Sequence, residues 1–453
     1  MSTTTPGAAA ADRLSLYRAI WRWHFFAGLL SIPFLVILAV TGSLYLFKSE
    51  INHTVFAYRT VVADPGTPPE SASTLVANAE AAVPGATATS YASPATATDS
   101  VVVTVKGETG KTLVYLNPYD GAVLAVLDAS AEPMQVIKKI HSLEYFGTFT
   151  NRLIEAAAGF CLMLVVTGIY LWWPRGQSGG VVSVRGTPRQ RRWWRDVHAV
   201  TGAFAGIVMF FLAITGMPWS GVWGAKVGEY ADSHGLGYPA QLWNEVPTST
   251  IPTSAVTPGA GWAVENAPVP LSTPAAEAAP IGIDKALQAA KTAGMAPGFD
   301  LALPSDETGV YTASRYFGDL SRERTIHIDQ YSGKPIVDIA FKDYGPVGRA
   351  IEFGINVHQG MEWGRLNQLA MLATCLALIA SSVTAIVMWW KRRPEGKVGV
   401  PPYPADPKVY RFLWIVAIVF GLAFPISGLA VLAMLAVDFL VIRTVPPLRR
   451  AFS

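Results

Sequence analysis

Four histidines stand out because they form two pairs at similar places in the sequence. His24 and His198 each open a long apolar run, and His141 and His358 each precede one. An ionisable ring at membrane depth is costly and usually functional. Facing pairs of imidazoles could fill both axial positions of a haem iron, hold a metal ion or carry protons.

Other features of the sequence separate these chemistries. Zinc sites take four Cys, His, Asp or Glu ligands at close spacing, which the sequence does not offer. Glu144 and Glu362 follow the second pair of histidines and keep a metal or proton role open there. The two cysteines, Cys161 and Cys375, lie inside apolar runs, where we expect them to pack. Without a Cys-x-x-Cys-His motif, any haem would be held non-covalently, as haem b.

The composition describes an integral membrane protein. Of 453 residues, 51% are hydrophobic and 15% are charged, and the net charge of +3 is too small to predict a nucleic-acid partner. An apolar run at 411–442 is interrupted at Pro425 and is expected to form a hairpin, which brings the expected number of spans to six. The other runs long enough to cross a bilayer and contact membrane lipid are 24–47, 150–173, 198–222 and 366–390.

Lysine and arginine residues predict the orientation. They gather before the first span, between the second and third, and after the fourth, so the N-terminus and these segments are predicted to be cytoplasmic. Two long segments, 48–140 and 224–349, are left on the other side. Both contain short β-like runs around the turns "PYDG" and "QYSG", and each is therefore predicted to form a small α+β domain.

The sequence also repeats itself. "HFFAGLLSIPFLVILAVTG" aligns with "HAVTGAFAGIVMFFLAITG", which pairs His24 with His198. "GIYLWW" aligns with "AIVMWW", and the interval from Trp172 to Trp389 equals that from His141 to His358. The chain is therefore expected to be a tandem duplication of a unit made of span, external domain and span.

These observations predict an all-α membrane bundle of four core spans in tandem repeat plus a C-terminal hairpin, with two external α+β domains. The expected segments are 1–47 (N-terminus and first span), 48–140 (first external domain), 141–175 (second span), 176–195 (basic loop), 196–223 (third span), 224–349 (second external domain), 350–393 (fourth span), 394–408 (loop) and 409–445 (hairpin).

The spans must set the heights of the histidines. A continuous helix from His141 to Trp172 would be about 46 Å long, close to the thickness of a bilayer with its headgroups. We therefore expect His24 and His198 near the cytoplasmic surface, and His141 and His358 near the outer surface. Candidate partners of haem propionates at the cytoplasmic level are Arg18, Arg22, Arg192 and Arg195.

Several residues near the outer ends of the spans are candidates for the side that meets a substrate. The same aromatic residues could equally anchor the chain in the interface, and the same histidines could be ordinary surface residues. The candidates are Tyr45, His53, Trp219, Trp223, Tyr230 and His234.

The sequence resembles the PepSY-associated transmembrane family. The resemblance rests on "LYRAIWRWHFFAGLLSIPFLVILAVTGSLYLFKSEI", "YLNPYDGAVL", "HIDQYSGKPI", "TGMPWSGVWG" and "FPISGLAVL", and it covers about residues 14–442. It implies a bacterial inner-membrane protein with two periplasmic PepSY domains. For the best understood members it also implies a di-haem reductase of ferric siderophores, with His24, His198, His141 and His358 as the matched ligands.

The resulting expectation is a di-haem b electron conduit that reduces a ferric siderophore or other ferric chelate at the periplasmic face for iron uptake. The chain carries no flavin reductase domain and no dinucleotide fingerprint, so the donor would be a quinol or a separate reductase. No side chain is assigned as catalytic. Two alternatives stay open: a PepSY-based binding or regulatory module on a membrane anchor, and a cytochrome b that serves another acceptor.

Overall fold

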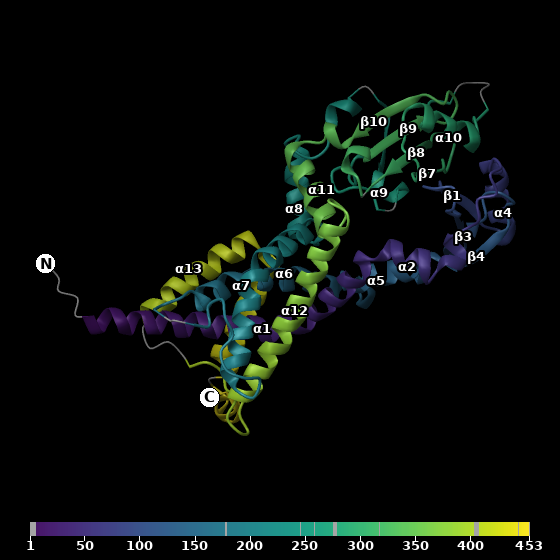
Figure 1. Cartoon of the computed structure of the whole chain (residues 1–453). Helices are drawn as coiled ribbons and strands as arrows, with labels where there is room; N and C mark the ends of the chain where they lie inside the picture. Colours follow the sequence, from purple (N-terminus) through teal and green to yellow (C-terminus); the bar gives the residue numbers. More distant parts are fainter. Residues whose placement is uncertain are drawn as a thin grey trace. The chain divides into compact units, whose positions relative to one another are not determined.

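The computed structural model describes residues 6–176, 179–244, 246–257, 259–274, 279–316, 318–402, 407–442 and 444–452 (Figure 1). The chain divides into two compact units. The helical unit comprises Met1–Ser43, Lys139–Lys226 and Leu369–Ser453. The sheet unit comprises Leu44–Lys138 and Val227–Gln368.

Long apolar helices form the helical unit. Its principal helices are α1 (Pro6–Leu46), α6 (Thr148–Trp172), α7 (Arg191–Gly216) and α12 (Arg365–Arg392). In the described residues, five helices are long and apolar enough to cross a membrane: Ser15–Leu46, Thr148–Trp172, Arg191–Trp219, Arg365–Arg392 and Pro425–Ile442. Because a bilayer offers the backbone no hydrogen-bond partners, such helices satisfy their own amides and carbonyls.

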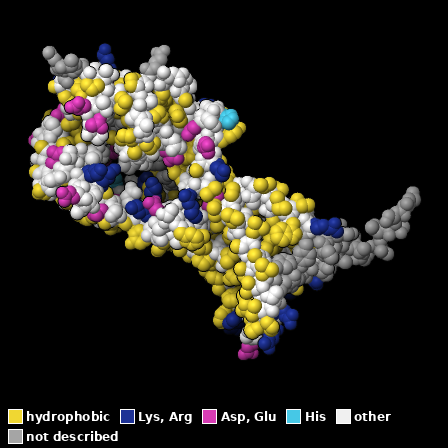
Figure 2. Space-filling view, turned by 180° about the vertical axis from the view of Figure 1, so that it is seen from behind, with side chains coloured by type: hydrophobic (Ala, Val, Ile, Leu, Met, Phe, Trp, Pro, Cys, Tyr) yellow, Lys and Arg dark blue, Asp and Glu magenta, His cyan; other side chains and the backbone are white. Residues whose placement is uncertain are grey.

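The surface of the helical unit is also that of a membrane protein. On the face drawn in Figure 2, hydrophobic side chains cover it. Phe204 and Ile207 of α7 are 68% and 75% exposed, and Leu422 is 78% exposed. An apolar surface of this extent needs lipid or protein to cover it.

The C-terminal segment forms a helical hairpin, as the interruption at Pro425 predicts. Helix α13 (Pro407–Ala423) ends just before Pro425, which begins α14 (Pro425–Ala436). The two helices meet at Gly421 and Gly428, where a Cβ on Gly428 would lie 2.3 Å from the Cα of Gly421. The apolar part of α13, Leu413–Ala423, is shorter than a full span, so the sixth expected span is a short helix. The π-helical turn η7 (Val437–Ile442) and α15 (Pro446–Phe452) follow.

An eight-stranded antiparallel sheet is the centre of the sheet unit, in the order β10-β9-β8-β7-β1-β2-β3-β4. Its strands are β1 (Thr87–Ala92), β2 (Val101–Gly107), β3 (Gly110–Leu116), β4 (Val123–Asp128), β7 (Asp300–Ala302), β8 (Val310–Arg315), β9 (Arg324–Asp329) and β10 (Pro335–Ala340). A separate pair is formed by β5 (Thr248–Pro252) and β6 (Pro268–Pro270).

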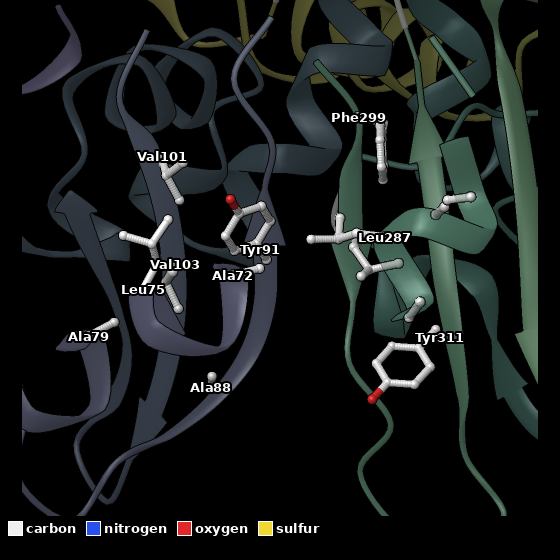
Figure 3. Close-up of a cluster of buried hydrophobic side chains, with 14 of the residues drawn as sticks. Ala72, Leu75, Ala79, Ala88, Tyr91, Val101, Val103, Leu287, Phe299 and Tyr311 are labelled. Carbon is white, nitrogen blue, oxygen red and sulfur yellow. The ribbon is translucent and has the colours of Figure 1, made fainter. Parts of the chain in front are cut away.

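The two external segments do not form two separate sheets. Strand β1 pairs with β7, with Tyr91 opposite Leu301, so strands from both segments share one sheet. One hydrophobic core also joins them, with Val103 from the first segment and Phe299 and Tyr311 from the second (Figure 3). Pairing two strands that would otherwise be open edges satisfies their backbone groups, which explains why one sheet forms.

Shorter helices complete the two units. Those before the second long helix are α2 (Lys48–Thr54), α3 (Ala57–Thr60), α4 (Ala72–Ala82), η1 (Ala129–Ala131), α5 (Pro133–His141) and η2 (Glu144–Phe146). Those after the third are η3 (Met217–Trp219), α8 (Trp223–Ser233), η4 (Ala240–Trp243), α9 (Thr253–Val256), α10 (Ile283–Thr292), η5 (Leu320–Arg322), η6 (Phe341–Asp343) and α11 (Pro346–His358).

Matching contacts recur at the spacing of the sequence repeat. The indole nitrogen of Trp172 donates to the Val181 carbonyl at 2.8 Å, and that of Trp389 donates to the Val398 carbonyl at 2.8 Å. The interval between the two tryptophans equals the interval between the two valines. Equivalent sequence positions in the two halves therefore make the same local structure.

Candidate functional site

The helical unit brings His24 and His198 together. His24 lies on α1 and His198 on α7, and the centroids of their imidazole rings are 6.2 Å apart. The two ring planes are nearly perpendicular, at 84°. This is the pair that the repeat predicts to share one level of the bundle.

The other ring contacts fix the tautomer of each histidine. Nδ1 of His24 lies 2.9 Å from the Thr167 hydroxyl, which itself donates to the Met163 carbonyl. Nδ1 of His198 lies 3.0 Å from the Ser381 carbonyl and 3.2 Å from the Thr384 hydroxyl. A carbonyl can only accept, and a hydroxyl that already donates must also accept. Each Nδ1 therefore carries the hydrogen, and each Nε2 keeps a lone pair for a ligand.

Glycines leave space beside these rings. Gly28 and Gly202 each come one helical turn after a histidine and so lie on the same helical face. A Cβ on Gly202 would meet nothing within 4 Å, and a Cβ on Gly28 would meet a single side-chain atom at 3.8 Å. On the neighbouring helix, a Cβ on Gly168 would lie 3.2 Å from Cε1 of His24. Small residues therefore keep room for a planar group next to the pair.

The donor set fits the iron of a haem. Metal–imidazole bonds are about 2.0 Å long and a ring nitrogen lies about 1.1 Å from its centroid, so two rings on opposite sides of one metal have centroids about 6.2 Å apart. The observed separation is 6.2 Å. The Nδ1 hydrogen bonds are those that metal-bound histidines ordinarily make through their second nitrogen. In the described part of the chain, no cluster of three or more His, Cys, Asp or Glu side chains is arranged to hold a metal ion.

His141 also reaches the helical bundle. It ends α5, and its Nδ1 lies 2.9 Å from the hydroxyl of Thr41, which donates to the Ile37 carbonyl. A Cβ on Gly42 would lie 3.3 Å from Cε1 of His141. The same tautomer argument places the hydrogen of His141 on Nδ1. Along the axis of α1, Thr41 lies about 25 Å from His24, so His141 belongs to a second level of the bundle.

The estimate of about 46 Å from His141 to Trp172 was too long, because it assumed one continuous helix. The chain does not run as one helix between them, since α5 ends at His141 and α6 begins at Thr148. Between the two, Leu143 adopts a left-handed φ of 57° and Gly147 a φ of 103°. This turn brings His141 back beside the bundle instead of leaving it one helix length away.

His358 is the last residue of α11 and belongs to the sheet unit. Its predicted pairing with His141 stays a prediction. The nearby carboxylate of Glu362, considered as a metal or proton group, instead accepts a hydrogen bond from the Asn356 amide. That amide also donates to the Gly318 carbonyl at 2.6 Å, so Asn356 ties the end of α11 to its surroundings.

The four candidate arginines differ in their contacts. Arg22 is buried, and its guanidinium binds the Asp438 carboxylate at 2.5 Å and the Pro401 carbonyl at 2.6 Å. Arg195 is paired at 2.5 Å with Asp196, which also binds Arg185. Both arginines therefore have protein partners. Arg18 and Arg192 are exposed at the same end of the bundle.

The candidates for the substrate side do not gather in one place within either unit. In the sheet unit, Lys48 covers the ring of Tyr45, and Nε2 of His53 lies 3.1 Å from Asp99. The carbonyl of Ser49 and the Asp99 carboxylate raise the pKa of His53. The remaining four candidates form local contacts or lie exposed: Tyr230 stacks on His234, Trp223 stacks on Phe424, and Trp219 is 39% exposed.

Sequence reasoning missed the threonines that orient the histidines. Thr167 and Thr384 are separated by the same interval as Trp172 and Trp389. They directly precede the aligned "GIYLWW" and "AIVMWW", so the repeat held the signal. Thr41 was recognised as a repeated position, but its contact with His141 was not predicted.

Comparisons with known proteins agree with the resemblance in the sequence. The profile of a family described as the PepSY-associated TM region matches residues 21–392, which is most of the chain. No curated protein matches the chain.

Proposed function

Because the chain belongs to the PepSY-associated transmembrane family, we propose that it is a di-haem b electron conduit of the bacterial inner membrane. Its acceptor is a ferric siderophore or another ferric chelate on the periplasmic side. The observation that carries the proposal is the pair His24 and His198, with ring centroids 6.2 Å apart and both Nε2 lone pairs available.

The side chains of this site bind and orient rather than react. A bound haem would supply a one-electron carrier at this level. His24 and His198 would hold its iron, while Thr167 and the Ser381 carbonyl keep the two rings in the required tautomer. The arginines at this end of the bundle, Arg18 and Arg192 above all, are the candidates for binding propionates because they are exposed.

The second level follows from the duplication. We infer that the chain is a tandem repeat of a two-span unit, because the tryptophan contacts and the histidine–threonine contacts recur at the aligned positions. His141 and His358 would then ligate the second haem. The two levels are about 25 Å apart along α1, measured from His24 to Thr41. Carriers at two heights give electrons a route through the bundle.

The direction of transfer rests on the positive-inside rule. The end of the bundle with Arg22, Arg192 and Arg392 would face the cytoplasm, and the sheet unit would lie in the periplasm. A quinol or a separate reductase would donate electrons. Siderophores bind Fe(III) strongly through hard oxygen ligands, and one electron converts it to Fe(II), which they hold more weakly. The protein would thereby free the iron for uptake.

The first test is a reduced-minus-oxidised visible spectrum of the purified full-length protein, with haem quantified per chain. We expect about two b-type haems in the wild type and about one after His24→Ala, His198→Ala or His358→Ala. His234→Ala is the matched control, because His234 is an exposed histidine outside both pairs. Wild-type protein without haem, made where haem is plentiful, would refute the proposal.

A second test addresses the acceptor. Chemically reduced protein is mixed anaerobically with a ferric siderophore while the haem spectrum and the Fe(II) trapped by a chromogenic chelator are followed. We expect the haems to be oxidised as Fe(II) appears in equal electron equivalents. Protein that carries two haems but stays reduced would leave the electron conduit standing and exclude ferric chelates as its acceptor.

A further inference from the structure

Two carboxylates are buried against each other in the sheet unit. Glu323 immediately follows η5 and is 2% exposed, and Glu352 lies on α11 and is 1% exposed. A Cβ built on Gly261 would lie 3.0 Å from Oε1 of Glu323 and 2.7 Å from Oε1 of Glu352. Both carboxylates therefore border the small space that the missing side chain of Gly261 leaves.

Most of the oxygens at this place have no hydrogen-bond partner. Oε1 of Glu352 accepts from the Ala263 amide at 3.0 Å. Its Oε2, both carboxylate oxygens of Glu323 and the hydroxyl of Tyr344 are buried without a partner. Tyr344 is 2% exposed, and its hydroxyl lies beside the Glu323 carboxylate. Four oxygen atoms from three side chains thus converge unsatisfied.

The surroundings offer the pair no compensating positive charge. Ala263 and Tyr344 belong to a hydrophobic cluster with Trp243, Val337 and Ile339. The other ionisable neighbours are Glu265 and Tyr316, which add a carboxyl and a phenol. In the described residues, neither glutamate forms an ion pair with a lysine or arginine. Burial raises the pKa of both glutamates, and their mutual repulsion raises that of Glu323 further.

A pocket provides access. It has a volume of about 640 Å³, and Glu323 contributes to its lining. Its basic residues are already engaged: Arg324 binds the Asp338 carboxylate at 2.5 Å, and Arg322 lies 3.2 Å from Asp319. The excess of unpaired acceptor oxygens therefore lies at the inner side of the pocket, where an entering cation would be attracted.

We propose that Glu323 and Glu352 bind one divalent cation of the calcium class, entering from this pocket. The donors are all hard oxygens, which select calcium-like ions over zinc or copper. Calcium accepts irregular sets of carboxylate, phenol, main-chain and water oxygens, so two glutamates and Tyr344 are a sufficient protein share. A bound cation also removes the cost of two facing buried charges. The site is independent of the electron-transfer function.

The test is calcium binding by the full-length protein in detergent, after treatment with a chelator and dialysis. With calcium chloride as the probe, we expect about one ion per chain with a dissociation constant between about 10⁻⁵ and 10⁻³ M. Glu323→Gln and Glu352→Gln should each weaken binding at least tenfold. Glu307→Gln, an exposed glutamate of the same unit, is the control and should bind like the wild type.

Gly261→Ala gives a second, chemically different variant if a glutamine variant does not fold. Its methyl group would fill the space between the carboxylates and should also weaken calcium binding. Wild-type protein that binds no calcium, or glutamine variants that bind it unchanged, would overturn the proposal. Without a cation, the raised pKa values predict that the pair holds a proton, and stability is then lost as pH rises through the folded-state pKa. A pH dependence that calcium does not abolish would likewise overturn the cation site.

Discussion

The contacts of the two histidine rings predict unequal effects for two equivalent threonines. In the described structure, Nδ1 of His24 has one acceptor, the Thr167 hydroxyl at 2.9 Å. Nδ1 of His198 has two acceptors, the Ser381 carbonyl at 3.0 Å and the Thr384 hydroxyl at 3.2 Å. Thr167→Val should therefore weaken haem binding more than Thr384→Val, although the two residues occupy equivalent repeat positions.

The magnitude follows from the tautomers. Without haem, an imidazole that loses its acceptor can move its hydrogen to the other nitrogen. With haem bound, Nε2 is occupied and Nδ1 must keep the hydrogen, so the unpaired N–H of His24 costs about 1–3 kcal/mol in the bound state only. That cost corresponds to roughly a 10- to 100-fold loss of haem affinity. Thr384→Val leaves the Ser381 carbonyl in place and should cost under about 1 kcal/mol.

The assay measures haem per chain and the rate at which haem passes from each variant to an excess of apomyoglobin. We expect fast loss of one haem from Thr167→Val and near wild-type retention in Thr384→Val. Thr374→Val is the matched control, because Thr374 lies on the same helix as Thr384 and its hydroxyl donates only to the Ala370 carbonyl. Equal losses in the two variants, or unchanged retention in Thr167→Val, would refute the reasoning.

Three further variants test the helical unit. Asp438→Asn removes the partner of the buried Arg22, so it should lower the free energy of unfolding by about 3–5 kcal/mol, measured by thermal or denaturant unfolding. Gly428→Ala should destabilise more than Gly421→Ala in the same measurement, because the added Cβ meets the opposing Cα at 2.3 Å in the first case and 3.3 Å in the second. Gly202→Leu should leave the melting temperature nearly unchanged, since its site is open, yet reduce haem content; retained haem would contradict the assignment of that space.

The membrane part of the fold was largely predictable because its signals are local. A run of apolar residues determines a span by itself, and the break at Pro425 lies between α13 and α14 as predicted. The close approach of His24 and His198 was predictable for a different reason: the repeat places them at equivalent heights. The short α13 was harder to predict, because the apolar sequence continues through a helix end that Pro425 determines.

The sheet and the buried pair of glutamates could not be predicted in the same way. Pairing of β1 with β7 joins strands that are far apart in the sequence, and nothing in either strand distinguishes an edge partner within its own domain from one in the other. Glu323 and Glu352 follow no periodic pattern and meet only because η5 and α11 pack together. Contacts between distant segments depend on tertiary packing, which spacing along the chain does not encode.

The helices exchange roles between the two histidine levels, and this exchange explains how one duplicated unit can serve both. At the first level, α1 supplies the histidine, His24, and α6 supplies the orienting hydroxyl, Thr167. At the second level, α1 supplies the hydroxyl, Thr41, and the segment before α6 supplies the histidine, His141. A two-span unit therefore carries one ligand and one orienting group for each level. Duplicating it adds the second ligand at each height, so that both levels would be completed by the same event.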